Sequence, residues 1–195
     1  MLFFRDFNGA LWELFIGNLM MFIAIVFYII WWISSKGATL VDDSGVFIFV
    51  TLLLGVVAII TTVAGISNLP CSEGGLPVHR IVIGAITVFV ITLLVTQTVF
   101  NRMMTTELPL IILWTALELS IVAALSNCNR LGNVSIISLA AVTIMAATVG
   151  LICYILHYRL DESLRFRNGL IPLIADLSVV AVICAATALS SEKTM

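Results

Sequence analysis

The stretch Leu108–Leu125 is LPLIILWTALELSIVAAL, and its single charged residue is Glu118. The neighbours of that carboxyl group are Leu117 and Leu119, and no Lys or Arg lies within the stretch. A segment of about 20 mainly apolar residues is long enough to cross the hydrocarbon core of a bilayer as a helix. The stretch therefore predicts a transmembrane helix that carries one acid near mid-depth.

Five further stretches have the same apolar character: 11–33, 45–66, 81–100, 134–158 and 170–189. The 195 residues are 62% hydrophobic and 10% charged, whereas soluble domains are about 45–50% apolar and about 25% charged. Backbone polar groups must be paired within lipid, and these continuous apolar runs lack the alternation of barrel strands. We therefore expect an all-α, polytopic membrane protein in which residues 1–195 form one domain, a bundle of six transmembrane helices.

The first hydrophobic stretch differs from a cleaved signal peptide. It is longer than a signal peptide's apolar region, and Tyr28, Trp31 and Trp32 close it. Aromatic residues of this kind concentrate at membrane interfaces, which favours an interfacial anchor here. Its many bulky side chains predict a helix that faces lipid or a partner subunit over much of its circumference.

The chain carries a faint internal repeat of three helices. Leu11–Leu14 (LWEL) opens the first half, and Leu113-Trp114, followed by Glu118-Leu119, opens the second. Gly75–Pro77 precedes the third helix, as Gly169–Pro172 precedes the sixth. Three helices per half would make the halves inverted, as in many small transporters. The alternative is chance similarity between apolar segments.

An even number of crossings places both termini on one side of the membrane. The basic residues divide four to five between the two sides, and Arg159, Arg165 and Arg167 share one expected loop on the side opposite the termini. Positively charged loops favour the cytoplasm. The sequence therefore favours a multi-pass protein of the cell membrane with extracytoplasmic termini.

Cys71 and Cys128 fall in expected loops on the side of the termini. They are able to form a disulfide if that side is oxidising. Because sequence does not establish the geometry that a bridge requires, we favour two unpaired thiols.

Glu118 and Asp176 are the strongest candidates for function. An ionised carboxylate in hydrocarbon costs from about 2.5 to more than 10 kcal/mol, so intramembrane acids are candidate binding sites by default. Trp114 precedes Glu118 by four residues and shares its helical face. Asp176 follows Pro172 by four residues, and proline leaves a backbone carbonyl without its helical donor. The alternatives are a neutral carboxylic acid that links two helices, and a proline tolerated close to a helix start.

Glu13 and Asn18 complete the candidate substrate- or proton-binding set. Glu13 lies near the start of the first hydrophobic stretch, and Asn18 follows Gly17, which leaves room on the helix for a ligand or another helix. The alternative for Glu13 is a position among the lipid headgroups.

The sequence predicts no metal and no cofactor. Cys153 and His157 share a helical face, but a zinc site needs three or four ligands. His79 and His157 belong to opposite sides of the membrane, so they cannot clamp one haem. No nucleophile or nucleotide-binding motif occurs, and a net charge of −2 provides no basic surface for nucleic acid.

Three functional hypotheses follow. The first is a small transporter or channel, linked to protons or cations, for a small non-anionic solute. The second is a non-catalytic accessory or scaffold subunit, with a membrane partner subunit or a second copy of the chain beside it in the bilayer. The third is an intramembrane lipid-modifying enzyme, although the chain lacks the nucleophile or metal set that such enzymes usually carry. We expect a protein that is not an enzyme.

Overall fold

The computed structural model describes residues 7–34, 45–69, 78–98, 107–129 and 131–192. These residues form six α-helices and one 3-10 turn: α1 (Phe7–Ser34), α2 (Gly45–Asn68), α3 (Val78–Thr98), α4 (Glu107–Asn127), α5 (Asn133–Leu156), η1 (His157–Arg159) and α6 (Glu162–Glu192). The all-helical prediction is confirmed, and each expected hydrophobic stretch corresponds to one helix.

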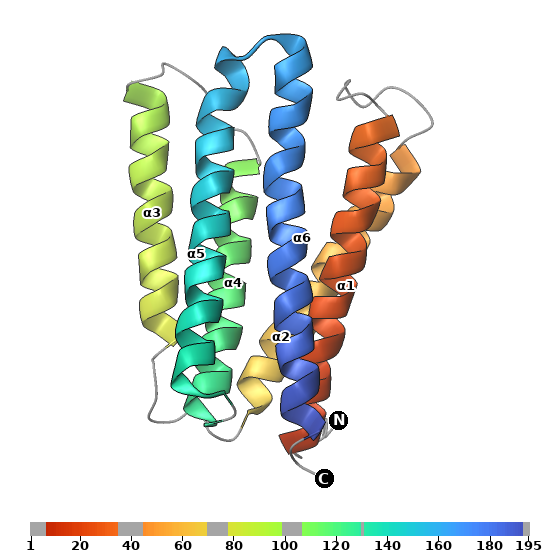
Figure 1. The fold of residues 1–195 in the computed structure, drawn as a ribbon, viewed down its shortest axis with the longest axis vertical. Coiled ribbons are helices and arrows are strands. Elements are labelled where there is room, and N and C mark those ends of the chain that lie inside the picture. The colour runs from red at the N-terminus through yellow and green to blue at the C-terminus, as the bar shows by residue number, and fades with distance from the viewer. Residues whose placement is uncertain (1–6, 35–44, 70–77, 99–106, 130, 193–195) are drawn as a thin grey trace.

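The helices run alternately up and down, and both chain ends lie at the same end of the molecule (Figure 1). Five of them form a closed ring in which α1 packs on α2, α2 on α4, α4 on α5, α5 on α6 and α6 on α1. Helix α3 lies outside this ring and packs chiefly on α4. The candidate site lies among these five helices.

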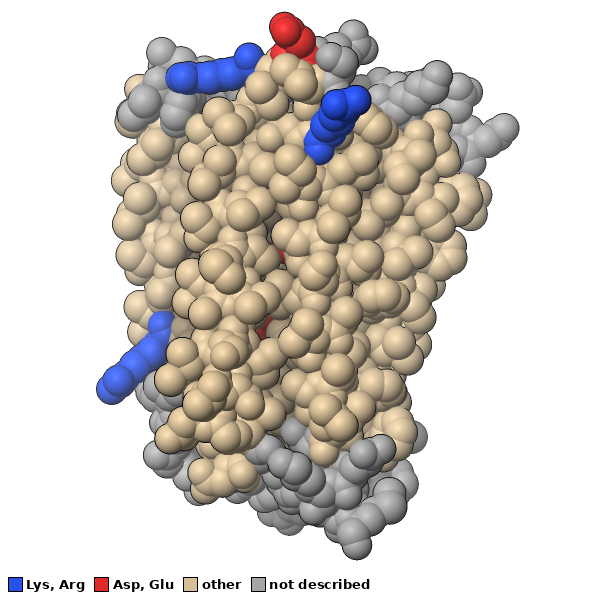
Figure 2. Space-filling model, in the orientation of Figure 1, with Lys and Arg blue, Asp and Glu red and all other residues tan. Residues whose placement is uncertain are grey.

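The outer surface of the ring and of α3 is apolar. Large hydrophobic side chains are exposed along α2 and α3, among them Phe49, Leu53, Ile83 and Ile86. On the face shown in Figure 2, the protruding charged side chains lie near the top and at the lower left, and a broad uncharged surface separates them. Such a surface suits contact with lipid tails and is consistent with a multi-pass membrane protein.

Five helices are long and apolar enough to cross a membrane: Gly9–Ser34, Val46–Asn68, Arg80–Thr98, Asn133–Leu156 and Leu164–Leu189. The apolar part of α4, Ile111–Asn127, is shorter than these. With 21 residues, α4 is about 32 Å long, close to the thickness of the hydrocarbon core. The sixth crossing therefore remains a prediction, supported by the antiparallel place of α4 in the bundle.

The prediction for the connector between the fifth and sixth helices was wrong. Residues 159–169 were expected to form a loop, but α6 begins at Glu162 and includes Arg165 and Arg167. The backbone N–H of Arg165 donates to the carbonyl of Asp161 at 2.8 Å. Hydropathy indicates where a helix leaves the lipid, but the helix itself can continue into water. Helix α6, with 31 residues, extends beyond its apolar stretch in this way.

The same boundary changes the interpretation of Pro172. The sequence alternative placed this proline close to a helix start, where it is tolerated, whereas the structure places it inside α6, ten residues after Glu162. Pro172 has no N–H to donate to the carbonyl of Asn168, one turn earlier.

Helix α1 packs closely on α2 through glycine. A Cβ atom added at Gly17 would lie 2.9 Å from the backbone nitrogen of Thr62, and one added at Gly65 would lie 2.9 Å from the backbone nitrogen of Leu14. Small residues let two helices approach in this way. One face of α1 packs on α2 and α6. Trp12, Leu19 and Ile33 are exposed, as expected of a helix that faces lipid or a partner over much of its circumference.

The two halves of the chain do not repeat their packing. Helix α6 packs extensively on α5, but its counterpart α3 packs chiefly on α4, the first helix of the other half. The inverted repeat therefore stays a prediction from sequence.

Candidate functional site

A cavity of about 310 Å³ lies between α1, α2, α4, α5 and α6. Its lining begins near mid-depth with Trp114 and Asp176 and continues to Trp32, His157 and Asn168, toward the end of the bundle opposite the termini. The volume lies at the lower end of the range of about 300–1,000 Å³ that is typical of small-molecule sites. Among the described residues, the lining contains no Lys or Arg.

Toward the termini, the bundle is packed and apolar. Side chains from α1, α4, α5 and α6 form a buried cluster there, with Leu11, Leu14, Ile121, Leu125 and Ile183 fully buried. Next to Trp114 lies a second buried cluster that includes Ile25, Leu117 and Val180. The cavity therefore extends toward one end of the bundle, and apolar packing fills the other.

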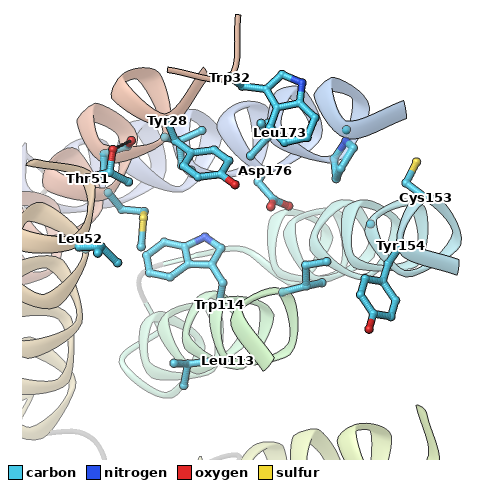
Figure 3. A pocket seen from close by; sticks show the side chains of 18 of the residues that line it. Tyr28, Trp32, Thr51, Leu52, Leu113, Trp114, Cys153, Tyr154, Leu173 and Asp176 are labelled. Carbon is cyan, nitrogen blue, oxygen red and sulfur yellow. Dashed lines mark hydrogen bonds between the residues drawn. The ribbon is translucent and has the colours of Figure 1, made fainter. Parts of the chain in front are cut away.

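Asp176 stands near the middle of α6 and lines the cavity. Figure 3 shows its carboxylate pointing into the same space as the side chains of Tyr28, from α1, and Trp114, from α4. Acidic atoms are also visible within narrow openings at mid-height of the molecular surface (Figure 2). Asp176, the one acid among the described lining residues, thus lies at the deep end of the cavity, among aromatic rings.

Glu118 lies one turn after Trp114 on α4 and is 2% exposed. It is not part of the cavity lining, but it lies near enough to Asp176 for the two carboxylates to repel each other when both are charged. Its side chain also interacts electrostatically with that of Trp114. Neither Glu118 Oε1 nor Trp114 Nε1 has a partner in hydrogen-bonding geometry among the described residues. Two acids and an indole are thus gathered at the base of the cavity, and Glu118 Oε1 has unused hydrogen-bonding capacity.

Glu13 and Asn18 lie elsewhere in the bundle. The Glu13 carboxylate accepts a hydrogen bond of 2.8 Å from Asn68 Nδ2 at the end of the bundle that holds the termini. Asn18 is fully buried, and its Nδ2 donates to the carbonyl of Leu14 at 2.8 Å. Neither residue lines the cavity. Of the five candidates, the structure brings together Glu118, Asp176 and Trp114.

Trp32 and its neighbours form the far wall of the cavity, and the sequence did not single them out as a site. The indole N–H of Trp32 donates to the carbonyl of Phe166 at 3.2 Å, and the two rings stack with centroids 6.2 Å apart. A Cβ atom at Gly169 would lie 3.0 Å from Trp32 Cε2, so the ring rests directly on the backbone of α6. From the sequence, Trp32 was predicted to be an interfacial anchor because it lies at a helix end. The one sequence feature that could have indicated closer packing is Gly169, whose lack of a side chain leaves room for the ring.

Asn168 joins α6 to α5 at the same wall. It is buried, and its Nδ2 donates to the carbonyl of Cys153 at 2.7 Å. Its own carbonyl is the group left without a helical donor by Pro172. Asn168, Pro172 and Asp176 therefore place polar groups on successive turns of α6, all within the cavity lining.

The described residues contain no group of three His, Cys, Asp or Glu side chains that is able to hold a metal ion. Cys153 and Cys184 are free thiols, whereas Cys128 is disulfide-bonded. The expectation of an unpaired thiol at Cys128 is therefore wrong. Cys71, the partner considered from sequence, lies outside the described residues.

Comparisons with protein-family models, with curated proteins and with solved structures find no match. The functional argument consequently depends on the geometry of the cavity and on the chemistry of its lining.

Proposed function

We propose that this protein is a small membrane transporter or channel, linked to protons or cations, that moves a small non-anionic solute. The observation that carries the proposal is the cavity at membrane depth, with Asp176 in its lining and Glu118 near enough to interact with it. An ionised carboxyl group is energetically unfavourable at this depth in the membrane. Two acids that only linked helices by hydrogen bonds would not need a cavity beside them.

The pair supplies the coupling chemistry. Two neighbouring carboxyl groups in a medium of low dielectric cannot both be ionised at low cost, so a proton or a bound cation must accompany the second charge. A positively charged solute bound at Asp176 would reduce the repulsion between the two carboxylates. When the solute leaves, one of the two carboxyl groups would have to take up a proton again. Binding of solute and binding of a proton are thereby linked.

The lining supports the selectivity against anions. An anion in this cavity would meet Asp176 and no lysine or arginine among the described lining residues. The apolar clusters pack the bundle on the side of the termini. This packing is consistent with one state of an alternating-access transporter, in which the site is closed on that side and open on the opposite side.

The experiment is solute-driven proton movement in proteoliposomes loaded with a pH-sensitive dye. A panel of small neutral and cationic solutes should produce a dye signal for at least one member with the unaltered protein. Glu118→Gln should abolish that signal, because the amide keeps the shape and loses the proton-binding group, while Glu13→Gln serves as the matched control and retains it. An undiminished signal in folded Glu118→Gln protein would remove the coupling claim.

A second candidate function is that of an accessory or scaffold subunit of a membrane complex. Its support is α3, which lies outside the ring and exposes Val82, Ile83, Ile86 and Ile91. Purification with a stoichiometric membrane partner, together with no solute flux by the isolated protein, would favour this function over transport.

We further propose that the termini face the extracytoplasmic side of the cell membrane. Disulfides persist in oxidising compartments, and Cys128 lies at the end of the bundle that holds the termini. Arg159, Arg165 and Arg167 lie at the opposite end, in agreement with a cytoplasmic location for positive charge.

A further inference from the structure

We propose that the cavity binds a small lipophilic organic cation, such as a quaternary ammonium group carried on an apolar body. The cationic head would lie at Asp176, between the rings of Tyr28 and Trp114. This inference deepens the proposed transport function, since it names the ligand class of the same site, but its test measures binding and does not depend on transport.

The deep end of the cavity combines the two groups that recognise an organic cation. A carboxylate supplies the opposite charge, and the faces of Trp and Tyr attract a cation through their ring quadrupoles, most strongly when water is excluded. Trp114 is 8% exposed and lines the cavity, and its side chain converges with those of Tyr28 and Asp176 (Figure 3). A charged head placed there would contact one acid and aromatic rings from two other helices.

An unpartnered acid oxygen lies close to the same spot. Within the described part of the chain, Glu118 is 2% exposed and its Oε1 is unpaired, while its side chain interacts with the indole of Trp114. Glu118 lies one turn from Trp114 and near Asp176, so its carboxyl group adds a second polar group close to the bound head. Unpaired buried atoms also occur at Asn18, Trp31, Thr62 and Thr143, none of which lines the cavity. At Glu118 the neighbouring cavity offers a place for a ligand that would explain the unpaired oxygen.

The rest of the lining suits an apolar body. Met21, Ala24, Ile25, Leu52 and Ile59 bring aliphatic surface from α1 and α2 to the cavity. An inorganic cation such as Ca²⁺ takes six to eight oxygen ligands, or brings its own water. Here the oxygen atoms are few, and the hydroxyl of Thr51 already donates to the carbonyl of Phe47 at 2.8 Å. The chemistry favours a cation that carries its own hydrocarbon.

The test uses two ligands of one shape. Benzyltrimethylammonium and neopentylbenzene differ by a nitrogen in place of a carbon, and hence by one positive charge. Titration calorimetry of the full chain in detergent should show saturable binding of the cation, and the neutral ligand should bind at least about tenfold more weakly. Equal affinity for the two ligands, or no saturable binding of the cation, would overturn the proposal.

Variants separate the groups involved. Asp176→Asn should weaken binding of the cation by about tenfold or more and leave the neutral ligand unaffected, whereas Asp161→Asn, an exposed acid outside the cavity, should change neither. Trp114→Phe keeps an aromatic face and should retain most of the affinity that Trp114→Leu loses. Unaltered affinity in folded Asp176→Asn protein, or equal affinity in the two Trp114 variants, would contradict the assignment.

The outcomes distinguish this inference from the proposed function. Binding of the cation without any flux in proteoliposomes would support the inference and count against transport. Flux of neutral solutes by a protein that does not prefer the cation over its neutral isostere would support transport and overturn the inference.

Discussion

At the scale of single residues, the bundle treats its polar groups in two ways. Glu13 and Asn18 each have a hydrogen-bond partner, Asn68 and the carbonyl of Leu14. Glu118 Oε1 and Trp114 Nε1 have none among the residues that the structure describes. An unpaired buried group loses the hydrogen bonds it would make to water. Asn18 Oδ1 is also without a partner among the described residues, so the candidate site shares this cost with other parts of the bundle.

Because Asn18 does not line the cavity, we predict that it contributes to stability and not to ligand binding. Asn18→Ala removes the hydrogen bond to the Leu14 carbonyl within α1 and should lower the free energy of unfolding by about 0.5–1.5 kcal/mol, the usual net contribution of one hydrogen bond. The affinity for benzyltrimethylammonium should stay within about twofold of the unaltered protein, which is less than about 0.5 kcal/mol.

Asn168→Ala provides the comparison, because Asn168 lines the cavity and bonds to the carbonyl of Cys153. If Asn18→Ala weakens ligand binding as much as Asn168→Ala does, as judged by titration calorimetry, the division between these residues is incorrect.

At the scale of helices, close packing depends on where glycine meets a neighbour. Gly17 lies against the backbone of α2 at Thr62, whereas a Cβ atom added at Gly84, on α3, would meet no other described atom within 4 Å. The same residue type therefore holds two helices together at one position and has no contact at the other. Sequence does not separate the two cases, because both glycines stand in continuous apolar runs.

The two glycines give a matched pair of substitutions. Gly17→Ala should destabilise the protein by about 1–3 kcal/mol, because the added methyl group forces α1 and α2 apart. Gly84→Ala should be neutral or stabilising by up to about 1 kcal/mol, because alanine is the better helix former. Unfolding in mixed micelles, followed by circular dichroism, measures both, and equal effects would show that the α1–α2 contact is looser than described.

At the scale of the whole molecule, the two ends of the bundle differ in chemistry. One end holds both termini and the disulfide-bonded Cys128, and the other holds Arg159, Arg165 and Arg167 together with the far wall of the cavity. A protein inserted in one orientation would thus present the cavity toward a single compartment, the cytoplasm in the orientation proposed above.

Labelling from each side of the membrane checks this orientation. Asn133→Cys, at the start of α5, should react with a membrane-impermeant maleimide added outside intact cells, and Asp161→Cys should react only in inverted vesicles. Both positions are exposed, so accessibility within the protein does not limit either reaction. Both labelling variants also carry Cys153→Ala and Cys184→Ala, so that the described free thiols do not react with the maleimide. The reverse pattern would place the termini in the cytoplasm.

The sequence by itself determined that the chain is a bundle of apolar helices, because helix length and hydrophobicity depend on local composition and on the thickness of the bilayer. It also identified Glu118 and Asp176, because an acid in an apolar run is conspicuous wherever the run lies. Its helix boundaries failed at residues 159–169, where the helix continues past the apolar run.

Only the tertiary structure decided which candidates meet. Depth along a helix follows from residue number, but the neighbour that a side chain faces depends on the rotation of each helix and on which helices pack together. That packing placed Asp176 beside Trp114 and Glu118 and left Glu13 with Asn68. Helix packing also brought Tyr28 and Trp32 into the cavity wall, although the sequence indicated that both are interfacial anchors. The contact of Trp32 with Gly169 joins residues that are far apart in the chain, so the sequence does not reveal it.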